Sequence, residues 1–263
     1  MADGSFMEWA LRHDRVVVAS GLLVVILLSW AYLLMGAGMM QEMGGMLMPM
    51  NMRPWTFGHV VLVFAMWAVM MVAMMLPSAA PTILLYGVIA RRRGKGNALV
   101  AASSAFVFGY AVVWAAFSLA AVALQFGLER AALVSSMMET TSIAVAGTVL
   151  IAVGLCQWTP LKQACLRRCR SPLEFITEHW RPGVGGAFWM GSRHGIYCVG
   201  CCGSLMLLLF VGGVMNLAWI GGLALFVLIE KLAPAGHWIS YGAGVLLVAW
   251  GVATLLGLAK WFL

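Results

Sequence analysis

The chain alternates between apolar runs of about 20 residues and short polar links. A helix needs roughly 20 apolar residues to cross a bilayer, and the unbroken apolarity of these runs favours helices over a barrel. We therefore predict an all-α protein, a single polytopic transmembrane bundle over residues 1–263 with about seven helices. The predicted helices cover approximately residues 16–35, 57–90, 98–124, 142–158, 194–211, 217–229 and 238–258.

Two runs depart from a simple span. The first follows Arg12 and Arg15 as a signal peptide would, but its length of about 20 residues exceeds the usual apolar core of about 7 to 15, so we expect a retained helix. The second would be roughly 50 Å long as a helix, which exceeds the thickness of a bilayer. It contains Pro77 and Pro81, where we expect a break or a kink. The fifth and sixth predicted helices could also form one span.

The composition is typical of a membrane protein, and the distribution of basic residues predicts which loops face the cytoplasm. A hydrophobic content of 63% with 10% charged residues excludes an ordinary soluble globule. The net charge of +7 indicates no nucleic-acid partner, because the basic residues stand in short links between apolar runs. With a cytoplasmic N-terminus, all of the 16 Lys and Arg residues except Arg53, Arg130 and Lys260 face the cytoplasm. The positive-inside rule thus predicts N-in, C-out, with an outer loop at 36–56 and a cytoplasmic loop at 161–186.

The stretch from His194 to Cys202 carries the densest chemistry in the chain. In a helix, His194, Cys198 and Cys202 fall at i, i+4 and i+8, and Cys201 follows Cys198 by three positions, so all four share one face. Thiolates suit Cu(I), Zn(II) or an iron–sulfur cluster, whereas two thiols alone would form a redox couple. The cytoplasmic loop offers two more candidate ligands, Cys165 and Cys169.

Methionines form a second population of sulfur ligands. Thioethers bind Cu(I) without deprotonation, so they suit an oxidising outer compartment, and thiolates suit the reducing cytoplasm. A methionine stripe in a helix can also be packing, because methionine fills irregular gaps. The candidate ligands of the outer loop are Met39, Met40, Met43, Met46, Met48, Met50 and Met52, and those of the second predicted helix are Met66, Met70 and Met74, with Met71 and Met75 on a neighbouring stripe.

Other polar residues give weaker indications. No Ser-His-acid, paired-carboxylate or phosphate-loop arrangement stands out, so enzyme activity is not predicted. Glu230 and Lys231 stand at the end of the sixth predicted helix, and we expect them to snorkel to the interface as an ion pair rather than to form a proton relay.

Several of these segments resemble a prokaryotic family of predicted metal-binding integral membrane proteins, a domain of unknown function whose members are sometimes labelled copper chaperones. The resemblance covers about Trp55 to Leu232. Gly203 departs from it, because an aromatic residue is expected after the Cys-Cys pair. The segments that carry the resemblance are 66–81, 158–162 with Cys165, 169–173, 191–202, Asn216, and Glu230 with Lys231. It implies metal binding in a bacterial inner membrane.

The leading hypothesis is copper handling, in which Cu(I) passes from outer methionines to the cytoplasmic cysteine–histidine site. One alternative is a membrane thiol-disulfide or electron carrier. The other is a structural subunit of a membrane complex, in which the cysteines hold zinc. Beyond the lipid bilayer, a membrane or periplasmic metalloprotein would be the partner of a copper-handling protein.

Overall fold

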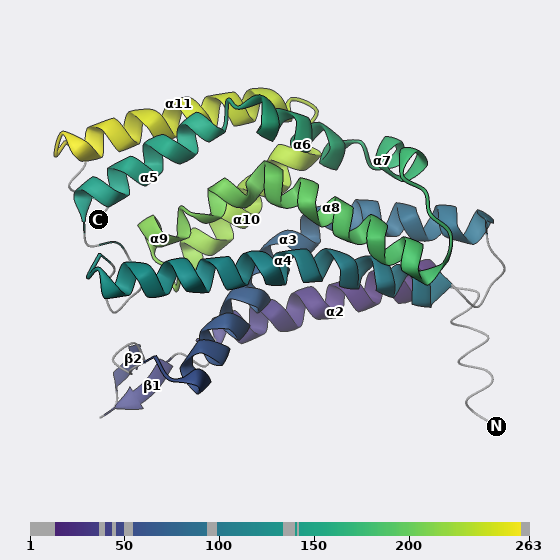
Figure 1. The fold of residues 1–263 in the computed structure, drawn as a ribbon, viewed down its shortest axis with the longest axis horizontal. Coiled ribbons are helices and arrows are strands. Elements are labelled where there is room, and N and C mark those ends of the chain that lie inside the picture. Colours follow the sequence, from purple (N-terminus) through teal and green to yellow (C-terminus); the bar gives the residue numbers. More distant parts are fainter. Residues whose placement is uncertain are drawn as a thin grey trace.

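The computed structural model describes residues 14–36, 40–43, 46–49, 55–93, 99–133, 140 and 142–258, and Figure 1 shows that part of the chain as a bundle of helices. A short antiparallel hairpin lies beside the start of α3 and adds no sheet to the bundle, so the predicted all-α class is confirmed. The elements are α2 (Asp14–Leu34), β1 (Met40–Met43), β2 (Met46–Pro49), α3 (Phe57–Arg93), α4 (Leu99–Arg130), α5 (Ile143–Cys156), α6 (Pro160–Arg170), α7 (Pro172–Glu178), α8 (Gly183–Met206), α9 (Leu209–Gly212), α10 (Leu217–Leu232) and α11 (Gly236–Leu255).

Five segments of the described chain are long and apolar enough to cross a membrane: α2, α3, α4, α8 with α9, and α11. The helices α5 and α6 qualify together as a sixth span that is bent by 63°. The 16 residues of α10 extend over about 24 Å, which is short of a bilayer core about 30 Å thick. Each of the predicted helices therefore corresponds to an observed helix, and the count of about seven is approximate.

The helices differ in how far they are covered by the rest of the bundle. The long helices α3 and α8 are buried along much of their length, whereas α2 and α11 are mostly exposed. In Figure 1 the described chain begins at the right-hand end of the bundle in α2, and α11 ends at the left. Exposed leucines and valines on α2 and α11 present apolar surface that suits lipid.

Of the break or kink predicted at Pro77 and Pro81, the break is wrong, because α3 continues through both prolines for 37 residues. Each proline removes one helical hydrogen bond, and polar groups of neighbouring residues bind a carbonyl in this region. The Met75 carbonyl accepts hydrogen bonds from the Ser78 hydroxyl at 2.8 Å and from the Tyr110 hydroxyl of α4 at 3.2 Å. The methionines of α3 from Met66 to Met75 all precede Pro77 on this helix.

The predicted polar loop at 161–186 is largely helical, and α8 begins at Gly183 rather than at residue 194. Glycines of α8 permit close packing against α4. A Cβ atom added to Gly191 would lie 1.9 Å from the Phe106 carbonyl oxygen of α4, and one added to Gly109 would lie 2.2 Å from the Phe188 carbonyl oxygen of α8. This contact fixes the first half of α8 against α4.

The methionine-rich outer loop is only partly described. Its backbone at β1 and β2 pairs Met43 with Met46 and Gln41 with Met48. Met40 pairs with Pro49 in the same hairpin. The candidate ligands Met39, Met50 and Met52 lie outside the described residues.

Candidate metal centre

Four buried thiols meet where α6 packs against α8. We call Cys169, Cys198, Cys201 and Cys202 the thiol cluster, and all four are free cysteines. The Sγ atoms of Cys198 and Cys202 are 3.7 Å apart, and Cys201 Sγ lies 3.8 Å from both Cys202 Sγ and Cys169 Sγ. Helical spacing on α8 supplies three of the thiols, and the helix that replaces the predicted loop supplies the fourth.

A thioether from α3 joins the thiol cluster. The Sδ atom of Met75 lies 3.7 Å from Cys202 Sγ, and Met75 is fully buried. The sequence placed Met75 on a neighbouring stripe and left it out of the candidate ligands. It lies on the continuous helix α3, two residues before Pro77.

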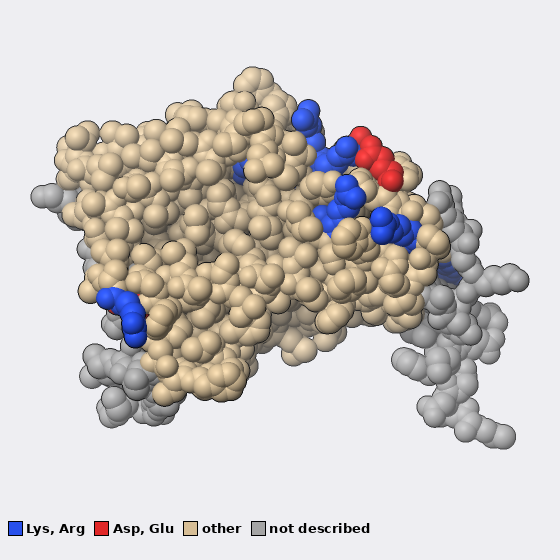
Figure 2. All heavy atoms as spheres, viewed as in Figure 1, with Lys and Arg blue, Asp and Glu red and all other residues tan. Residues whose placement is uncertain are grey.

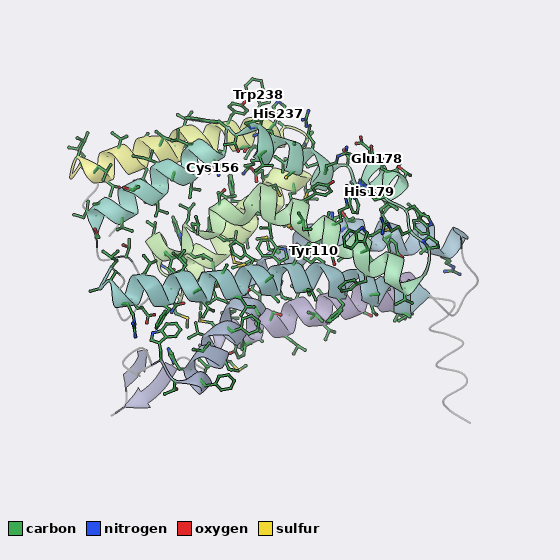
Figure 3. All side chains as sticks on the ribbon, in the orientation of Figure 1. Tyr110, Cys156, Glu178, His179, His237 and Trp238 are labelled. Carbon is green, nitrogen blue, oxygen red and sulfur yellow. The ribbon has the colours of Figure 1, made fainter. Side chains whose placement is uncertain are left out.

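The cation nearest to the cluster is Lys231 of α10. Its Nζ atom lies 3.0 Å from Cys198 Sγ and donates to the Ser78 hydroxyl at 3.0 Å. The Tyr110 hydroxyl lies 3.1 Å from the same Cys198 sulfur, and Figure 3 shows Tyr110 near the middle of the bundle. A buried ammonium group in contact with sulfur stabilises negative charge on it, so this arrangement favours a thiolate at Cys198.

The expectation that Glu230 and Lys231 form an interfacial ion pair is wrong. Glu230 is fully buried, and its Oε1 atom lies 2.8 Å from Lys162 Nζ of α6. Lys162 also donates to the Gln157 side-chain oxygen at the bend between α5 and α6. This pair ties α10 to α6, the helix that carries Cys169, and leaves Lys231 free to face Cys198. Consecutive residues of one helix thus point to different partners, which their position in the sequence does not reveal.

His194 shares a helix face with Cys198 but is surrounded by aromatic rings. Its ring centroid lies 5.2 Å from that of Phe175, 5.8 Å from that of Tyr110 and 6.1 Å from that of Phe106. The side chain is 2% exposed, and Nδ1 has no hydrogen-bond partner among the described residues. The structure therefore places His194 one helical turn from Cys198, among the rings of Phe106, Tyr110 and Phe175.

The remaining candidate ligands lie around the cluster rather than in it. Cys165 is half-buried and packs against α8, because a Cβ atom added to Gly200 would lie 2.6 Å from its Sγ atom. Met66, Met70 and Met74 are buried along α3 on the way to Met75. Cys156 lies on α5, away from Tyr110 in Figure 3.

The donor set of the cluster suits a soft metal ion. Four sulfur ligands about 2.3 Å from a tetrahedral metal are separated by roughly 3.8 Å, and the contacting sulfurs of the cluster show that separation. Within the described residues, however, no group of three or more His, Cys, Asp or Glu side chains is arranged to hold a metal ion. A common metal position therefore requires rotation of at least one cysteine side chain.

Comparison with known proteins places the chain in a family. No curated protein matches it. No solved structure matches it either. A family model described as PpoB2, copper chaperone, matches residues 64–254, a range that includes the thiol cluster, Met75 and Lys231. This match confirms the family suggested by the sequence motifs, and we conclude that the chain belongs to the PpoB2 copper chaperone family.

Proposed function

We propose that this protein handles Cu(I) in a bacterial inner membrane, and that the thiol cluster with Met75 is its inner binding site. The observation that carries the proposal is the 3.7 Å contact between Met75 Sδ and Cys202 Sγ, because it joins the methionine helix to the cysteines. Met66, Met70 and Met74 extend the series of thioethers toward the outer end of α3, where the methionine-rich hairpin precedes it.

Copper fits this donor set better than zinc does. Structural zinc sites use cysteine, histidine and carboxylate ligands, whereas thioethers select Cu(I). A Cu(I) ion bound by three thiolates carries a net charge of −2, and the ammonium group of Lys231 beside Cys198 offsets part of that charge. Lys231 would thereby lower the free-energy cost of burying a negatively charged copper site.

The proposed sidedness is N-in and C-out, with the thiol cluster inside the bundle, between the methionine-rich end and the basic cytoplasmic end. Figure 2 supports this orientation, because most of the Lys and Arg side chains on the visible face gather over α6, α7 and the start of α8. Copper would arrive at the opposite, methionine-rich end from a periplasmic or membrane metalloprotein and be passed inward. The direction of transfer follows from the stronger binding of Cu(I) by thiolates than by thioethers.

The thiol-disulfide alternative has one observation in its favour, the ammonium group and the hydroxyl that contact Cys198. Helical geometry weighs against a disulfide within α8. Helical neighbours at i+3 or i+4 have Cβ atoms about 5–6 Å apart, whereas a disulfide needs about 3.5–4.5 Å. A disulfide between Cys198 and either Cys201 or Cys202 would therefore require α8 to unwind.

A competition titration with a chromophoric Cu(I) chelator tests the proposal. The variant carrying Cys198→Ser, Cys201→Ser and Cys202→Ser should bind Cu(I) more than roughly 100-fold more weakly than the parent, since even changes outside the ligand shell cost about 10- to 100-fold. Cys156→Ser is the matched control and should retain the parent affinity. Parent protein that binds stoichiometric zinc and competes for no Cu(I) would instead support the structural zinc site.

A further inference from the structure

A cavity lies at the bend between α5 and α6. It has a volume of about 470 Å³ and is bordered by that bend, by α6 and by the start of α11. The side chains that matter for its chemistry are Trp158, Gln163, Arg167, Arg170, His237 and Tyr241. Figure 3 shows His237 and the neighbouring Trp238 at the edge of the bundle where α11 begins. The volume is in the range of small-molecule sites, about 300–1,000 Å³.

The lining of the cavity carries positive charge without a balancing carboxylate. Among the described residues, Lys162 pairs with Glu230 and Arg168 with Glu174 and Glu178, but no carboxylate lies within 4.0 Å of Arg167 or Arg170. None of the residues around the cavity is acidic. This excess of guanidinium groups suits an anion.

Arg170 is held in position for such an anion. Its Nη2 atom donates to the backbone carbonyl of Pro234 at 2.7 Å and to that of Ala233, at the end of α10. A guanidinium group has five N–H donors, so others remain for a ligand in the cavity. Arg167 precedes it by three residues on α6 and reaches the same cavity.

The other side of the cavity is aromatic and faces the lipid-exposed surface. The Trp158 indole N–H donates to the Tyr241 carbonyl at 3.2 Å, which joins α5 to α11. Close by, Trp238 and Leu161 are each 69% exposed. Tryptophan and tyrosine are typical of the interface between headgroups and hydrocarbon. The cavity therefore combines an anion-binding side with an apolar border.

We propose that this cavity binds the phosphate group of an anionic glycerophospholipid at the cytoplasmic interface of the membrane. Arginine side chains bind phosphate through paired hydrogen bonds, and basic pockets between membrane helices accept anionic headgroups. The bound lipid braces α6 against α10 and α11. Because Cys169 stands next to Arg170 on α6, the lipid also holds the helix that supplies one thiol of the cluster. The assignment is independent of copper.

Native mass spectrometry of the purified full-length protein tests this site, with phosphatidylglycerol and phosphatidylcholine as probes. The parent should bind phosphatidylglycerol more tightly than phosphatidylcholine, and Arg167→Gln should lower that affinity by roughly tenfold, the size of one charge-assisted hydrogen bond. Arg168→Gln is the matched control: it removes the same charge from the same helix outside the cavity and should leave binding unchanged.

Two results would overturn the assignment. The first is equal binding of both lipids by the parent, or equal loss of lipid in the Arg167→Gln and Arg168→Gln proteins. The second is displacement of phosphatidylglycerol by millimolar inorganic phosphate, which would assign the cavity to a free anion. Retention of the lipid at that phosphate concentration, together with the selective effect of Arg167→Gln, would support a lipid headgroup site.

Discussion

Met75 is the methionine of α3 that contacts the thiol cluster. Replacing Met75 therefore tests whether its sulfur binds the metal or only packs in the core. Both Met75 and Met71 are fully buried on α3, and Met75 lies 3.7 Å from a cysteine sulfur. Replacing either by leucine nearly conserves volume and should cost less than about 1.5 kcal/mol of stability. We expect Met75→Leu to weaken Cu(I) binding in a chelator competition by roughly tenfold. Met71→Leu should leave it unchanged, and equal behaviour of the two variants would assign Met75 to packing alone.

At the scale of single residues, the sequence predicts the three thiols of α8 because helical spacing alone brings them to one face. It does not predict Met75 or Lys231, because their place in the cluster depends on tertiary packing of α3 and α10 against α8. His194 shows that spacing in the sequence does not reveal which groups surround a side chain. Its spacing from Cys198 is that of a ligand, but aromatic rings from α4 and α7 surround it in the fold.

The contact between α4 and α8 is the element-level feature that positions the cluster, and Gly191 is its tightest point. A Cβ atom at Gly191 would lie 1.9 Å from a backbone oxygen of α4, so Gly191→Ala must push the two helices apart. We expect a loss of about 1–3 kcal/mol or more of stability. Thermal unfolding in detergent measures this loss directly.

Gly185 provides the control for that variant on the same helix. A Cβ atom at Gly185 meets nothing within 4 Å, so Gly185→Ala should be neutral or slightly stabilising, since alanine is the better helix former. Similar unfolding temperatures for the Gly191→Ala and Gly185→Ala proteins would contradict the role assigned to this contact.

The helices could be predicted from the sequence where apolar residues follow one another without interruption. They were harder to predict where polar residues or glycines lie inside a helix. The segments α6 and α7 read as a loop because of their basic residues, although Thr159 accepts a hydrogen bond from the Lys162 N–H and Pro160 stands at the first helical position of α6. Both are signals of a helix start. Glycine in α8 allows close packing against α4, and α3 continues through its two prolines; local propensities reveal neither feature.

At the scale of the whole molecule, the fold places sulfur along a path from one end of α3 to a buried cluster with a cation beside it. Most of the basic side chains on the visible face gather near α6 and α7 (Figure 2). We therefore propose, as the central claim, that Cu(I) binds to the sulfur atoms where α3, α6 and α8 meet.

X-ray absorption at the copper edge of the Cu(I)-loaded, full-length protein tests this claim most directly. The account predicts a first coordination shell of sulfur only, without the nitrogen of His194. It also predicts that this signal is lost in the Cys198→Ser, Cys201→Ser, Cys202→Ser protein and kept in Cys156→Ser. A first shell containing nitrogen or oxygen, or an unchanged spectrum in the triple variant, would contradict it.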